Sequence, residues 1–231
     1  MGSENVITRT SDTKTADNLI INGAANSVTD SSNATVGGTA NTVTTSSNVI
    51  VNGTNNNVLP NAYGGGSNNS VISGTGNNNT FSSNCIIVGQ SNKNNSNACS
   101  ALFGKGHTNS ANYSAMIGDT NYNYKANSFI GGYNNQNYGQ NTLTFGTGSY
   151  NATTNGIVGG KYNAANSSNL LELGNGTSSN RSNAFEVTDT GIARAYGTPI
   201  EDNDLVRMKE LKQVADNLVY ATDNDIDALW A

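Results

Sequence analysis

The segment Asn84-Cys-Ile-Ile-Val-Gly89 recurs along the chain with changed side chains but the same order of polar residue, apolar run and glycine. Upstream it is found as Asn18-Leu-Ile-Ile-Asn-Gly23 and downstream as Ser114-Ala-Met-Ile-Gly118. The closing glycines of the later units lie fourteen residues apart, at Gly104, Gly118, Gly132, Gly146, Gly160 and Gly174. A fixed short period indicates one small unit stacked on copies of itself, so the sequence predicts a solenoid.

Each unit is too short for a helix with two turns, but it fits two short strands joined by two corners. The apolar run supplies one strand, and glycine at the corner permits a positive φ or close packing of neighbouring turns. Because side chains alternate between the two faces of a strand, we expect the residues three and one before the glycine to point inward together. The sequence therefore predicts an all-β fold with a thin core.

Asparagine recurs at two fixed places in the unit. It lies five residues before the glycine at Asn84, Asn127, Asn141, Asn155 and Asn169, and three after it at Asn92, Asn121, Asn135 and Asn163. Asparagine tolerates left-handed backbone and caps turns with its own side chain. We expect stacked amides to form hydrogen-bonded ladders along the shaft.

Charge divides the chain into two regions. The formal net charge is -5, yet no charged side chain lies between Asp30 and Lys93, and half of the acidic residues follow position 200. No basic patch is present that could neutralise a row of phosphates, so we expect no nucleic-acid partner. No apolar run is long enough to span a membrane, and we expect no membrane insertion.

We divide the chain into an N-terminal arm (1–17), a repeat shaft (18–192) and a helical neck with the C-terminal segment (193–231). The shaft is expected to be irregular to about residue 89, where the steps between glycines Gly37, Gly53 and Gly74 are uneven, and regular over 90–176. The two cysteines, Cys85 and Cys99, are fourteen residues apart, so we expect them at equivalent places on adjacent turns. We interpret them as two small buried side chains, with a disulfide as the alternative.

The repeat resembles the head repeat of YadA-type trimeric adhesins, through closing phrases such as Asn112-Tyr-Ser-Ala-Met-Ile-Gly118 and Asn127-Ser-Phe-Ile-Gly131. The resemblance covers residues 84–175 well and 18–83 loosely. It implies a left-handed parallel β-roll of about 14 residues per turn, with three chains side by side as a homotrimer.

A second resemblance lies downstream. The segments Asn183-Ala-Phe-Glu-Val-Thr-Asp-Thr-Gly191 and Gly197–Leu211 are similar to the closing section of phage tail-fibre and minor structural proteins, in which a last β-turn passes into a helical neck. Asp202 or Asp204 is placed to cap that helix. An apolar stripe suited to a trimer axis follows at helical spacing: Leu205, Met208, Leu211, Val214 and Leu218.

No catalytic or metal site is expected, and no cofactor. The only histidine, His107, lies three residues after Gly104, so we interpret it as a substitution in the asparagine ladder. The shaft carboxylates, Asp119 and Glu172, lie several turns apart, which disfavours glycoside cleavage. Asp223-Asn-Asp225 with Asp227 resembles the start of a calcium loop, but we favour helix capping there because the loop glycine and closing glutamate are missing.

Exposed aromatic residues beside amides are typical of carbohydrate-binding surfaces, and packing at a trimer seam is the alternative. Candidate surface-glycan contacts are Tyr113, Tyr122, Tyr133 and Tyr150.

These features together predict a non-enzymatic phage virion fibre that contacts other virion proteins and a host-surface polysaccharide or protein, assembled in the host cytoplasm and functional outside it. The alternatives are a fragment of a bacterial trimeric autotransporter adhesin and an ice-binding solenoid, the latter disfavoured because threonines are expected out of phase.

Overall fold

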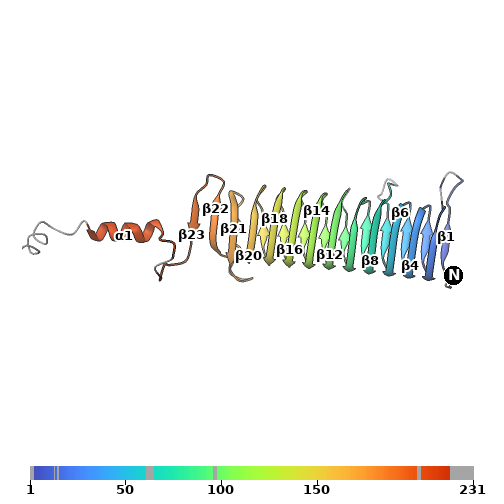
Figure 1. The fold of residues 1–231 in the computed structure, drawn as a ribbon, viewed down its shortest axis with the longest axis horizontal. Helices are drawn as coiled ribbons and strands as arrows, with labels where there is room; N and C mark the ends of the chain where they lie inside the picture. The colour runs from blue at the N-terminus through green and yellow to red at the C-terminus, as the bar shows by residue number, and fades with distance from the viewer. Residues whose placement is uncertain are drawn as a thin grey trace, which may run out of the picture.

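The computed structural model describes residues 3–12, 14, 16–60, 65–95, 98–201 and 204–218. These residues form a parallel β-solenoid of about ten turns, followed along the same long axis by one short helix (Figure 1). The predicted solenoid is therefore confirmed. Its successive strands are stacked side by side from the N-terminal end to the helical end.

Two sheets make up the solenoid, and each turn contributes one strand to each sheet. The small sheet holds the short strands β1 (Val6–Thr8), β3 (Ser27–Thr29), β5 (Thr42–Thr44), β7 (Asn57–Leu59), β9 (Asn78–Thr80), β11 (Lys93–Asn94), β13 (Thr108–Asn109), β15 (Tyr122–Asn123), β17 (Gln136–Asn137) and β19 (Tyr150–Asn151).

The large sheet begins with β2 (Ile20–Ala24), β4 (Ser32–Thr39), β6 (Ser47–Thr54), β8 (Ser70–Thr75), β10 (Ile86–Gln90) and β12 (Ser100–Lys105). It continues with β14 (Ser114–Asp119), β16 (Ser128–Tyr133), β18 (Thr142–Thr147), β20 (Ile157–Lys161) and β21 (Asn169–Asn175). The last two strands, β22 (Asn183–Thr188) and β23 (Ala193–Ala195), run antiparallel to their neighbours and close that end of the sheet. The helix α1 spans Met208–Leu218.

A continuous column of glycines fixes the register of the large sheet. Gly23 pairs with Gly38, and Gly38 pairs with Gly53, so Gly38 rather than Gly37 belongs to the column. A side chain is excluded here, because a Cβ on Gly118 would lie 2.1 Å from the carbonyl oxygen of Gly132 on the next strand. The described strands before residue 89 join the same two sheets, and Val6–Thr8 of the expected arm form the first strand.

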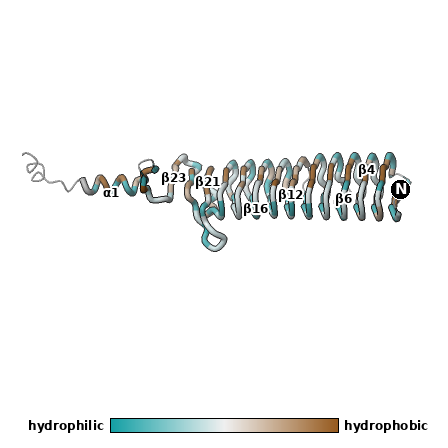
Figure 2. Tube along the Cα trace, turned by 60° about the horizontal axis from the view of Figure 1, so that its bottom comes forward, coloured by the Kyte–Doolittle hydropathy of each residue, from teal (hydrophilic) through white to brown (hydrophobic). Residues whose placement is uncertain are grey.

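The expected inward-facing positions are wrong by one residue. Ile87, two residues before Gly89, is fully buried, whereas its neighbours Ile86 and Val88 are exposed. Three consecutive apolar residues carry no alternation, so the sequence could not tell which of them faces the core. Figure 2 shows these apolar segments recurring at the same place on successive turns.

The interior changes character along the shaft. In the first turns the small sheet contributes Val28, Val43 and Val58, which are fully buried and stacked in register. From β9 onward the same column consists of asparagines, also fully buried: Asn79, Asn94, Asn109, Asn123, Asn137 and Asn151. The small-sheet side of the core is therefore apolar in the first turns and polar in the later ones, while the large sheet contributes buried apolar side chains to the later turns as well: Ile87, Leu102, Met116 and Ile130.

Hydrogen bonds satisfy the buried asparagines. The Nδ2 of Asn123 donates to Oδ1 of Asn109 on the preceding strand, at 2.9 Å, and to Oγ of Ser114, at 2.8 Å. The same pair of contacts recurs one turn later at Asn137, and at Asn94 the sulfur of Cys85 takes the place of the serine oxygen, at 3.2 Å. Buried polar groups are tolerated only when they are paired in this way.

A second buried ladder lies three residues after the glycines, as predicted. Asn41 donates its backbone N–H and its Nδ2 to Oδ1 of Asn26, and Asn56 does the same to Asn41. His107 takes the place of an asparagine in this ladder: its Nδ1 accepts the backbone N–H of Asn121, and its Nε2 contacts the carbonyl oxygen of Phe103. Burial lowers the pKa of His107, so the neutral imidazole is the form that fits.

A third ladder follows the exposed corner five residues before each glycine. Asn84, Asn127, Asn141 and Asn155 adopt left-handed backbone there, and Asn127 donates to Asn141 at 2.8 Å. Asn169 departs from this pattern, because it lies buried within β21.

The cysteines do not occupy equivalent places. Ile86 pairs with Ala101, a separation of fifteen residues, which puts Cys99 level with Asn84 and Cys85 level with Ser100. Cys85 is buried in the core, Cys99 lies at the exposed corner, and both are free thiols. The expectation assumed a fourteen-residue step where the register has fifteen.

Candidate interaction surface

The outer face of the large sheet carries exposed apolar side chains on successive strands. Two rows of outward side chains run along it, one on each side of the buried row. The first outer row is Ile20, Thr35, Ile50, Val71, Ile86, Ala101, Ala115, Phe129, Leu143, Ile157 and Leu171. The second outer row is Asn22, Gly37, Asn52, Ser73, Val88, Phe103, Ile117, Gly131, Phe145, Gly159 and Leu173.

Neither outer row contains a charged residue. Large side chains remain exposed along the face, including Ile86 at 45 %, Ile117 at 47 % and Phe129 at 42 %. Contiguous apolar patches of this size are unusual on monomers and are typical of interaction surfaces. The face exists because alternate residues of each apolar run point outward, as Ile86 and Val88 do beside the buried Ile87.

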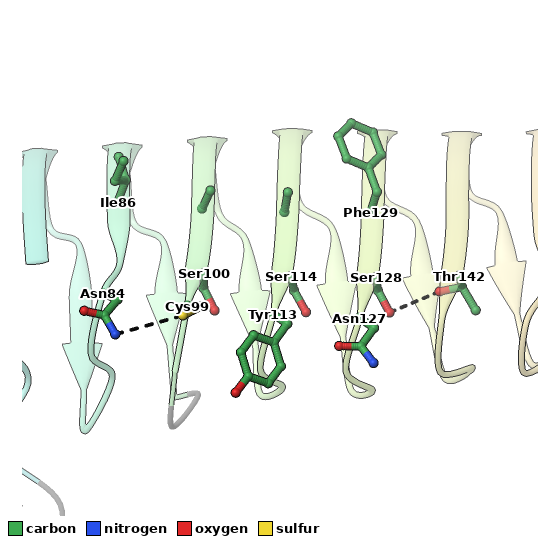
Figure 3. A pocket seen from close by; sticks show the side chains of 12 residues that line it. Asn84, Ile86, Cys99, Ser100, Tyr113, Ser114, Asn127, Ser128, Phe129 and Thr142 are labelled. Atoms are coloured by element: carbon green, nitrogen blue, oxygen red, sulfur yellow. Dashed lines mark hydrogen bonds between the residues drawn. The ribbon is translucent and has the colours of Figure 1, made fainter.

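A shallow depression interrupts the first outer row. Ala101 and Ala115 lie between the larger Ile86 and Phe129, and Figure 3 shows the corner residues along its border. Two of those corners carry Cys99 and Tyr113, with left-handed φ of 45° and 52°, where other turns carry asparagine. The asparagine ladder ends there, since Oδ1 of Asn84 still accepts from Asn69 but its Nδ2 meets the sulfur of Cys99, at 4.0 Å, in place of an amide oxygen.

The predicted apolar stripe is exposed in the region of α1. Met208, Leu211 and Val214 lie on the helix and are all more than half exposed. Leu205 precedes the helix, and the side chain of Leu218 lies outside the described residues.

Asp204 does not form the predicted helix cap. Asp204 accepts the backbone N–H groups of Ile200 and Glu201, upstream of the helix, and Asp202 lies outside the described residues. Glu210 instead accepts the backbone N–H of Arg207, as the third residue of a capping box does.

The four candidate glycan tyrosines do not form one surface. Tyr122 and Tyr150 belong to the small sheet, Tyr113 lies at the corner before β14, and Tyr133 ends β16 on the large sheet. A stack that the sequence analysis missed does form, with Tyr138 between Tyr124 and Tyr150 at ring-centroid distances of 4.6 Å and 5.0 Å. The stacked rings stabilise the sheet, and Tyr124 and Tyr138 are still 41 % and 38 % exposed.

Two carboxylates that are distant in the sequence lie together at the closed end of the shaft. Glu172 on β21 pairs with Glu186 on β22, and both side chains are buried. The Nδ2 of Asn169 donates to both carboxylates, and Arg194 lies 2.8 Å from Glu186. Burial raises the pKa of Glu172, whereas at Glu186 burial is outweighed by hydrogen bonds, first from Arg194, which lower its pKa. Since both carboxylates are engaged inside the fold, we interpret the pair as a structural plug.

Threonines are in phase over part of the shaft, contrary to expectation. Thr39, Thr54 and Thr75 pair on neighbouring strands, and Thr29 pairs with Thr44. The first column ends at Gln90, so the array covers three strands. That is too small a surface to carry an ice-binding proposal.

Other sites are not evident in the described part of the chain. No group of three or more His, Cys, Asp or Glu side chains is gathered there as metal ligands would be, and the calcium-like segment after position 222 lies outside it. The helix α1 has 11 residues, and no helix in the described part of the chain is long and apolar enough to cross a bilayer.

Comparison of the sequence with protein-family models and with curated proteins finds no match for this chain.

Proposed function

We propose that the protein is a non-enzymatic fibre or appendage of a phage virion, built as a homotrimer of parallel left-handed shafts that attaches to a host surface. The observation that carries the proposal is the charge-free outer face of the large sheet: its first outer row is apolar along the shaft except at Thr35, and its second outer row is apolar from Val88 onward. The exposed stripe on α1 continues along the same axis and offers a second contact between copies.

The face alone is smaller than two standard interfaces require. Eleven strands spaced about 4.8 Å apart, each about 20 Å long, give a face of about 1,000 Å² per copy, and a trimer divides it between two neighbours at about 500 Å² each. Stable interfaces bury about 800 Å² per partner, so the assembly also needs the contact offered by the stripe on α1. Three identical shafts would also present each surface contact three times, so that weak contacts add through effective concentration.

Solution mass tests the assembly. We expect about three times 23.9 kDa for the full chain in sedimentation equilibrium, and a partial shift to smaller species when residues 202–231 are deleted. A single folded species of 23.9 kDa at micromolar concentration would contradict the proposal. The attachment role is tested separately, by binding of the labelled trimer to intact bacterial cells and its loss on removal of surface polysaccharide.

A further inference from the structure

We propose that neighbouring copies of this chain interlock at one fixed height of the shaft, with Phe103 and Ile117 of one copy occupying the Ala101–Ala115 depression of the next. The inference rests on the proposed parallel assembly and specifies how its copies meet.

The depression and a protrusion lie on the same two strands. On β12 and β14 the first outer row has Ala101 and Ala115, whereas the second outer row has Phe103 and Ile117. Phe103 is 39 % exposed and Ile117 is 47 % exposed, so both project from the face. On the next strand the order reverses, with Phe129 in the first row and Gly131 in the second.

Rotational symmetry brings these features together. A rotation about an axis parallel to the shaft moves no residue along the shaft, so equal heights meet. It also gives a heterologous contact, in which one edge of a face meets the opposite edge of the neighbouring face. The second outer row of one copy therefore meets the first outer row of the next, and large side chains lie opposite small ones at this height.

The chemistry of the depression favours a second copy over a polar ligand. None of the residues that line it is charged, and Ile86, Ala101, Ala115 and Phe129 provide an apolar floor and walls. Phe103 and Ile117 are the protruding apolar side chains at the matching height. Their insertion would remove apolar surface from water on both copies and would fix the vertical register of the assembly.

Cross-linking tests the contact. Cys99 lines the depression as a free thiol, so Phe103→Cys should form an intermolecular disulfide with it under diamide oxidation. We expect covalent species up to the trimer on a non-reducing gel. The matched control is Ser73→Cys, which lies in the same outer row two strands away, about 10 Å along the shaft and beyond disulfide reach. Equal cross-linking of both variants, or of neither, would overturn the proposal.

A second variant fills the depression without removing a contact residue. Ala115→Trp should lower the solution mass toward the monomer while the β-sheet circular dichroism stays unchanged. An Ala115→Trp protein that keeps the wild-type mass would show that the depression is open in the assembly, available to a ligand such as a saccharide, and the interlock would be wrong. If the wild-type protein is a trimer but Phe103→Cys does not cross-link, the interlock fails and the proposed trimer stands.

Discussion

The first and the later turns of the shaft share one backbone but fill it differently. Val28, Val43 and Val58 stack in the early turns, whereas Asn109, Asn123 and Asn137 stack at the same positions later. The valine column is stabilised by removal of apolar surface from water, which is not directional. The asparagine column depends on hydrogen bonds of defined geometry, each linking one strand to the next. On its small-sheet side, the same fold is thus stabilised by non-directional apolar packing in the early turns and by directional hydrogen bonds in the later ones.

The largest effect should come from a charge placed in the asparagine column. In Asn123→Asp the donor Nδ2 is replaced by a carboxylate oxygen that faces Oδ1 of Asn109 and Oγ of Ser114. We expect the free energy of unfolding to fall by about 3–5 kcal/mol at neutral pH, because a buried charge is left uncompensated. Urea denaturation at fixed protein concentration measures this loss. Asn127→Asp, at an exposed corner, is the control and should change stability by less than about 0.5 kcal/mol. Equal losses in the two variants would contradict the distinction between the buried column and the exposed ladder.

A smaller loss of unfolding free energy should follow when asparagine replaces a valine of the early column. Val43→Asn places an amide between Val28 and Val58, and we expect a loss of about 2–3 kcal/mol because that amide has no partner. The triple replacement of Val28, Val43 and Val58 by asparagine would extend the ladder upstream from Asn79. The loss of unfolding free energy in the triple variant should be clearly less than three times the loss in Val43→Asn, since the new amides bind one another. Strict additivity in urea denaturation would argue that the asparagine column is not a cooperative ladder.

The smallest effect concerns His107, the imidazole in the other ladder. Its pKa is lowered by burial, while the hydrogen bond to the carbonyl of Phe103 and the charge of Asp119 act in the opposite direction. The unfolded chain therefore binds a proton more readily than the folded one, and stability falls as the pH drops below the unfolded pKa of about 6.5. His107→Asn should flatten this part of the stability curve between pH 7.5 and pH 5. Glu172, whose raised pKa acts in the opposite direction, is common to both proteins and cancels in the difference. Identical pH profiles would show that His107 is not held neutral.

Much of the fold could be read from the spacing of residues. The glycine period predicts the stacked strands, and the asparagines after the glycines predict the ladder that the structure contains, with His107 in its place. The buried column at Asn109 and Asn123 was missed, because asparagine in a two-residue strand cannot be told from asparagine in a turn.

The candidate surface was harder to predict. Its existence depends on which residue of the apolar run faces the core, and a run such as Ile86-Ile-Val88 gives no alternation to decide it. The pairing of Glu172 with Glu186 depends on a reversal of strand direction after β21, and the repeat period does not predict that reversal.

The central claim is that the apolar sheet face lies between copies arranged side by side. Small-angle X-ray scattering of the full chain measures mass per unit length together with particle length, which separates lateral from end-to-end association. The account predicts three times the single-chain mass on a particle whose shaft is one solenoid long. A mass per length of one chain, whether in short or in long particles, would contradict it.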